Sequence, residues 1–151
     1  GLAMADDGRG DATEREPDTP EAKLRALDQA AFTRLVANCF RALGWETTAF
    51  TASVDQYDVM ATRQHPIELR VLVWAVHRPD RDLDTAVVDR CATDRSKVDG
   101  ADVAALVTTG TVPEAVRERA RDHNVKLLDR EDLLDLLERE SLFDLVDDAL
   151  E

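Results

Sequence analysis

The stretch of residues 67–77 most constrains how this chain can fold, because it predicts a long strand in the middle of a sheet. A strand places alternate side chains on the same face. The odd-numbered positions of this stretch are all apolar: Ile67, Leu69, Val71, Val73 and Ala75. A strand with such a face is central rather than at an edge, so other strands must pair with both of its sides.

Helix and strand patterns alternate along the rest of the chain. Further strands are predicted at residues 47–52, 57–62, 103–108 and 125–128. Helices are predicted at residues 19–43, with a break near Asp28, and at residues 83–98, 113–124, 131–138 and 141–150. The order α-β-β-β-α-β-α-β-α predicts an α/β fold, with a mixed β-sheet and helices on both of its faces.

Length and composition predict a single domain. The chain has 151 residues, of which 44% are hydrophobic, enough for one sizeable core. Residues 1–18 are polar and carry a net charge of -4, so we expect a disordered acidic tail. Met4 is the expected natural start, after three residues left from cloning. The predicted domain is therefore residues 19–151.

The charge of the chain argues against tight binding to nucleic acids. There are 32 acidic and 19 basic residues, a formal net charge of -13, and lysine occurs only at positions 23, 97 and 126. Such an acidic, lysine-poor surface suits concentrated salt, where self-repulsion is screened, so a halophilic source is expected. Because phosphate contacts by Lys and Arg supply most non-specific affinity, any DNA binding is expected to be weak.

Two cysteines and the hydropathy of the chain indicate where the protein works. Cys39 and Cys91 fall in predicted helices without metal-type spacing, so we expect buried, free thiols in a reducing cytoplasm. No apolar run approaches the roughly 20 residues that span a bilayer, and no membrane association is expected. The predicted location is the cytoplasm.

Several segments, taken together and in order, resemble the catalytic domain of Mrr-type restriction endonucleases. The resemblance covers residues from about 28 to 138. Its most specific part is Val-Thr-Thr-Gly at residues 107–110, with the following Ala-x-x-x-x-Ala helix at residues 115–120. The other parts are Phe32-Thr-Arg-Leu-Val-Ala37, Leu43-Gly44-Trp45, Asp58-Val-Met-Ala61, residues 125–129 and Leu133-Leu134. The resemblance implies the restriction-endonuclease-like fold.

The resemblance also implies a metal-dependent chemistry that this chain lacks in part. The family holds one or two divalent ions with an Asp, a Glu or Gln and a backbone carbonyl. A Lys two residues after the Glu or Gln helps to position or activate the attacking water. Asp58 matches the Asp. The Glu or Gln and the Lys fall on Trp74 and Val76, and a Glu of the first helix falls on Thr33. These replacements indicate a pseudo-nuclease with no expected cofactor.

Single residues of this set also have structural interpretations. Asp58 is either a remaining metal ligand or a capped residue at the start of a strand, and the second reading is favoured because lone acids are more often structural. Trp74 is expected to fill the vacated pocket rather than to stack on a base. Arg117 and Arg121 lie four apart near Glu114 and Glu118, which favours a salt-bridged helix face over a phosphate clamp.

A relocated active site is the alternative. Glu68 and Arg70 have the spacing of the family's Glu-x-Lys, so with Asp58 they would form a migrated site that binds Mg²⁺ or Mn²⁺. The competing interpretation, which is favoured, is a cross-strand ion pair near a strand end.

Three functions follow from these observations. The leading one is an Mrr-like protein that has lost catalysis and acts as a DNA-associated or protein-interaction module in restriction, repair or replication. The second is an active metal-dependent DNA endonuclease with the migrated site. The third is a structural or assembly protein whose partner, a second copy included, binds the sheet edge or residues 141–150, although that segment is expected to pack on its own domain.

Overall fold

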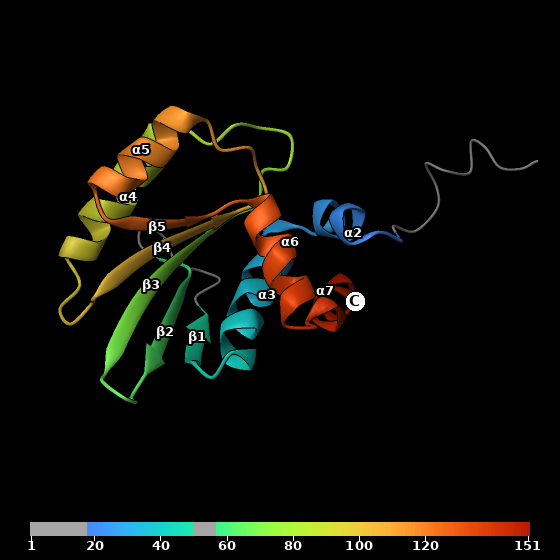
Figure 1. Ribbon diagram of the computed structural model, residues 1–151, viewed down its shortest axis with the longest axis horizontal. Helices are drawn as coiled ribbons and strands as arrows, with labels where there is room; N and C mark the ends of the chain where they lie inside the picture. Colours follow the sequence, from blue (N-terminus) through green and yellow to red (C-terminus); the bar gives the residue numbers. More distant parts are fainter. Residues whose placement is uncertain (1–17, 50–56) are drawn as a thin grey trace, which may run out of the picture.

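A computed structural model describes residues 18–49 and 57–151 of the protein (Figure 1). These residues form a five-stranded sheet with helices on both faces. The strands are β1 (Glu46–Ala49), β2 (Val59–Arg63), β3 (Leu69–Val76), β4 (Val103–Thr108) and β5 (Val125–Leu128). The helices are α2 (Pro20–Ala26), α3 (Gln29–Ala42), α4 (Thr85–Ser96), α5 (Glu114–Asp122), α6 (Arg130–Arg139) and α7 (Phe143–Leu150).

The sheet is mixed, and its strands lie in the order in which they occur in the chain. β1, β2 and β3 pair antiparallel, whereas β3, β4 and β5 pair parallel. The two parallel connections pass through α4 and α5, as parallel pairing requires. β3 is the third of the five strands, so the predicted central strand is confirmed.

Helices cover the two faces of the sheet unequally. α4 and α5 lie on one face, and α3 and α6 lie on the other, with α7 against α3 and α2 against α7 (Figure 1). Since adjacent side chains of β3 point to opposite faces, Val71 and Val73 join the core under α3, and Leu72 and Trp74 join the core under α4. The expected arrangement of helices on both faces is confirmed.

Local capping explains where the first helices begin and end. The hydroxyl of Thr19 accepts a hydrogen bond from the N–H of Ala22, and Pro20 occupies the first turn of α2. The carboxylate of Asp28 then accepts from the N–H of Ala31, 2.7 Å away, and starts α3. The predicted break near Asp28 is therefore the boundary between two capped helices.

The C-terminal helix packs on its own domain, as its apolar pattern predicts. Val146 is fully buried, and Phe143 and Leu145 pack against the same core as α3. Cys39 and Cys91 are buried and free, and burial raises the pKa of both thiols to about 12. Among the described residues, no helix is both long and apolar enough to cross a membrane.

Three predicted strands have different limits in the structure: β1 begins at Glu46 rather than at residue 47, and β2 spans Val59–Arg63 rather than residues 57–62. The strand predicted at residues 67–77 begins at Leu69, because residues 64–68 form the turn that leads from β2 into β3. Ile67, predicted on the buried face, is 64% exposed in this turn. The last residues of the strand predicted at 47–52, and nearly all of the predicted tail, lie outside the described residues.

The position of β4, which is paired on both sides, leads to a stability prediction. Leu106 is fully buried under α4 and α5, so Leu106→Ala removes apolar contacts and leaves a cavity. We expect the free energy of unfolding to fall by about 2–5 kcal/mol, measured by urea denaturation. Leu150→Ala, at a position 37% exposed, is the control and should change it by less than about 0.5 kcal/mol. Equal losses would contradict the assigned core.

Candidate functional site

Asp58 stands at the start of β2, beside the end of β3. Its N–H donates to the carbonyl of Val73, 2.9 Å away, and its Oδ2 accepts from the N–H of Ala75, 2.8 Å away. Burial raises the pKa of Asp58 above its ordinary value of 3.8, and the hydrogen bond from Ala75 opposes part of this rise. The carboxylate is thus held against the backbone between positions 74 and 76.

Trp74 lies between the two residues of β3 that Asp58 binds. The N–H of Asp58 donates to Val73 and its carboxylate accepts from Ala75, so Trp74 stands beside the start of β2. Trp74 is 6% exposed and packs in the core under α4 and α5. Its indole N–H is buried and makes no hydrogen bond to any described group. An apolar ring therefore fills the space in which the family's Glu or Gln is expected.

Val76 and Thr33 occupy the other two altered positions. Val76 packs against the same core as Trp74 and offers no polar group. Thr33 of α3 is buried, and its hydroxyl donates to the carbonyl of Gln29, 3.1 Å away. Neither side chain is free to contact an ion or a phosphate beside Asp58.

Gln29 of α3 closes the site from the other side. Its Nε2 donates to the carbonyl of Ala75, 2.8 Å away, and its Oε1 accepts from the N–H of His77, 3.0 Å away. Nε2 also lies 3.2 Å from the hydroxyl of Thr33. The backbone carbonyl between the two altered positions of β3 is consequently already bound by this chain's own amide.

The sequence analysis did not single out Gln29. Two features of the sequence point to Gln29. It lies four residues before Thr33, so both side chains lie on one face of the helix, and it directly follows the capping residue Asp28. A polar side chain on a helix face that covers a sheet needs a partner, and the end of a strand provides one.

The donor set at this site does not fit a divalent ion of the kind that the family uses. Magnesium and manganese prefer several oxygen ligands, commonly carboxylates. Asp58 offers one carboxylate, the side chains of Trp74 and Val76 offer no oxygen, and the carbonyl of Ala75 accepts a hydrogen bond from Gln29. Within residues 18–49 and 57–151, no group of three or more His, Cys, Asp or Glu residues could hold a metal.

The structure does not bring Glu68 and Arg70 to Asp58. Asp58 is hydrogen-bonded to the backbone of Val73 and Ala75, and Glu68 precedes these two residues by five and seven positions along the same segment. At roughly 3.3 Å per residue, the separation is about 20 Å. Glu68 Oε2 instead lies 3.8 Å from Arg70 Nη2. This is an ion pair within one segment and not the cross-strand pair that was expected. The three residues of the migrated site are therefore not assembled.

The Val-Thr-Thr-Gly segment has a structural role next to the site. The hydroxyl of Thr108 donates to the carbonyl of Val76, 2.9 Å away, and the hydroxyl of Thr109 accepts from the N–H of Arg78, 2.9 Å away. A Cβ on Gly110 would lie 2.5 Å from the carbonyl oxygen of Arg81, so no larger residue fits without movement. This segment ties the end of β4 to the end of β3.

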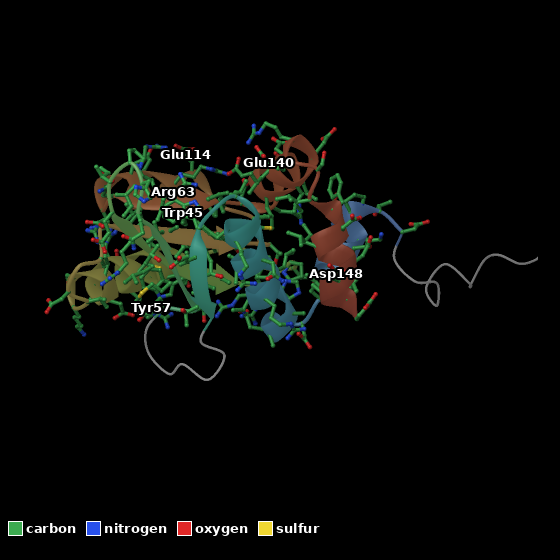
Figure 2. The ribbon with its side chains drawn as sticks, turned by 90° about the horizontal axis from the view of Figure 1, so that it is seen from below. Trp45, Tyr57, Arg63, Glu114, Glu140 and Asp148 are labelled. Carbon is green, nitrogen blue, oxygen red and sulfur yellow. The ribbon has the colours of Figure 1, made fainter. Side chains whose placement is uncertain are left out.

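The Leu-Gly-Trp turn that follows α3 is also fixed by structural contacts. Gly44 has a φ of 99°, a conformation that favours glycine. Arg63 of β2 donates to the carbonyl of Leu43, 2.9 Å away, and its guanidinium carbon lies 4.4 Å from the centre of the Trp45 ring (Figure 2). Arg63 pairs with Leu69, so this turn stabilises the fold at the end of β2 that lies away from Asp58.

Comparison with known proteins concerns the family and the fold. A family model described as a restriction endonuclease, for the Mrr catalytic domain, matches residues 24–137. No curated protein matches the chain in a comparison by sequence.

Three solved structures share the fold. The DNA modification-dependent restriction endonuclease AspBHI has a TM-score of 0.68 and 20% identity, over 99% of this chain and 43% of that chain. The restriction endonuclease MspJI in complex with a 27-mer oligonucleotide has a TM-score of 0.61 and 19% identity, over 99% of this chain and 38% of that chain. AF1548, a protein of unknown function, has a TM-score of 0.64 and 18% identity, over 82% of this chain and 79% of that chain. The chain spans less than half the length of the two enzymes, and the predicted restriction-endonuclease-like fold is confirmed.

Removing the amide of Gln29 should weaken the attachment of α3 to β3. Gln29→Leu leaves the carbonyl of Ala75 and the N–H of His77 without their partner. We expect the free energy of unfolding to fall by about 1–3 kcal/mol in urea denaturation. Arg34→Leu, an exposed position on the same helix, should change it by less than about 0.5 kcal/mol. A loss no larger than that of the control would contradict the assigned role.

The raised pKa of Asp58 predicts a pH dependence. Below the ordinary value of 3.8 the carboxyl is protonated in both the folded and the unfolded chain, so it has no effect on their balance. As the pH rises through the folded-state pKa, the unfolded chain ionises more readily, and ionised Asp58 costs stability. The Asp58→Asn variant has no such cost. The free energy of unfolding of this variant, minus that of the unsubstituted protein, should therefore increase from about pH 4 to about pH 7. Urea denaturation at both pH values measures this, and a difference that does not change with pH would contradict it.

Proposed function

Since the chain belongs to the Mrr-type restriction endonuclease family, we propose that it has lost catalysis and acts as a DNA-associated or protein-interaction module in restriction, repair or replication. The fold is that of DNA nucleases, and the site is where the chain departs from them. The observation that carries the proposal is Trp74, which is 6% exposed at the position of the family's Glu or Gln.

The surroundings of Trp74 support the loss of catalysis. Metal-assisted hydrolysis needs an ion that polarises the phosphate and lowers the pKa of a bound water. Among the residues that the structure describes, Asp58 is the one carboxylate hydrogen-bonded to the end of β3, and both backbone groups of Ala75 are bound by side chains. Val76 replaces the Lys that would act on the water, and it has no group that can hold or move a proton.

The relatives support association with DNA. The MspJI structure contains a 27-mer oligonucleotide, and the family is one of restriction enzymes. The net charge of -13 limits the affinity, because few cations can replace the counterions of the phosphates. Non-specific binding is therefore expected on the order of 10⁻⁴ M or weaker, carried by arginine contacts rather than by overall charge.

A cleavage assay tests the loss of catalysis. We expect no cutting of plasmid, linear or branched DNA with Mg²⁺ or Mn²⁺, at about 1 M KCl and at about 0.1 M KCl. Asp58→Ala and Glu68→Ala are tested beside the unsubstituted protein, and an active restriction endonuclease controls for the DNA and the buffer. Metal-dependent cutting that disappears in Asp58→Ala would overturn the proposal, and loss in Glu68→Ala as well would establish the migrated site.

Binding is scored on the same gels. A retained shift without cutting supports the DNA-associated function, with an affinity that decreases as KCl increases. The absence of a shift at any salt concentration would rule out the DNA-associated function and leave the protein-interaction function.

A further inference from the structure

β5 is the outermost strand of the sheet, and a hollow lies along its free edge. β5 pairs with β4 on one side only, and no described strand pairs with its other side (Figure 1). The hollow has a volume of about 280 Å³. It is lined by Arg117, Ala120, Arg121 and Asn124, from α5 and the turn after it, and by residues 125–127 of β5.

Cationic side chains stand on both faces of the sheet at this edge. Val125 and Leu127 pack in the core under α4 and α5, so Lys126, between them, points to the opposite face. Arg117 and Arg121 come from α5, which lies on the same face of the sheet as α4. The lining contains these three cations and no acid, in a chain whose net charge is -13.

Two of the three cations are available to a partner. Arg117 is paired with Asp129. Burial acts to raise the pKa of that carboxyl, but the N–H of Asp132 and the Arg117 guanidinium together hold it below its ordinary value. Arg121 pairs with Glu114 at 3.1 Å, but their side chains are 65% and 68% exposed, and such a pair is weak. Lys126 is exposed and makes no ion pair with a described residue.

The free edge also offers backbone groups. In a strand paired on one side, the N–H and C=O groups that point away from the partner strand have no ladder partner. An extended peptide can use them to join the sheet, which gives affinity through main-chain hydrogen bonds and specificity through its side chains. Adjacent side chains of such a peptide would point to the two faces on which Arg121 and Lys126 stand.

We propose that the free edge of β5 binds an acidic segment of a partner protein as an additional strand. Carboxylates on the two faces of the added strand pair with Arg121 and with Lys126. This inference names the surface for the protein-interaction part of the proposed function and rests on that part, not on the loss of catalysis.

Charge also selects against two other occupants. A second copy paired through β5 would bring two positive edges, each with its own Lys126, against one another. A DNA duplex extends beyond the hollow and would meet Glu118 and Asp122, exposed acids on α5. A short acidic strand matches the limited extent of the positive charge.

The test is a titration with a fluorescein-labelled peptide of repeated Val-Glu-Glu triplets, followed by fluorescence anisotropy and by the amide NMR signals of the protein. We expect saturable binding at about 0.15 M KCl that shifts the amides of residues 125–128. Arg121→Glu/Lys126→Glu should weaken binding by about tenfold or more. The same peptide with Lys in place of Glu should not bind.

The matched control is Arg34→Glu/Arg139→Glu, which changes the net charge equally at two exposed positions outside the hollow. It should leave peptide binding within about twofold of that of the unsubstituted protein. Equal weakening in both double variants, no shift at residues 125–128, or a selective effect of the Arg121 and Lys126 changes on duplex DNA would each overturn the proposal. DNA cleavage by the unsubstituted protein would overturn the proposed loss of catalysis and leave this titration unaffected.

Discussion

The two backbone groups of Ala75 face the start of β2, and each is held by a side chain from a different element. Asp58 accepts from the N–H, and Gln29 donates to the carbonyl. β2 begins only at Val59, so the last residues of β3 have no strand partner on that side, and these side chains replace one. These hydrogen bonds fix the carboxylate of Asp58 and tie the first residue of α3, whose apolar face is buried in the core, to the end of β3.

Most of the fold could be predicted because its patterns are local. Alternation marked β3 as central, and capping residues marked the boundary at Asp28 between α2 and α3. The limits of β3 were less predictable: Ile67 continues the apolar alternation but belongs to the turn after β2. Periodicity reports which residues could share a face, whereas the turn decides where pairing begins.

The site was predictable in part, for a different reason. The altered positions Trp74, Val76 and Thr33 follow from matching the sequence to the family's order of residues. The hydrogen bonds of Gln29 join residues that are more than forty positions apart, and no pattern in the sequence encodes that distance. Likewise, the spacing of Glu68 and Arg70 was suitable for a site, but the register of β2 against β3 places them far from Asp58.

The burial of Trp74 also bears on any attempt to build a metal ligand at this position. Trp74→Gln would replace a ring in a packed core by a smaller side chain, at a cost of about 3–5 kcal/mol if the cavity did not close. The new amide would be buried in an apolar core, and the carbonyl of Ala75 would still be bound by Gln29. One substitution would therefore lower the stability of the fold without assembling a set of metal ligands, so several positions would have to change together.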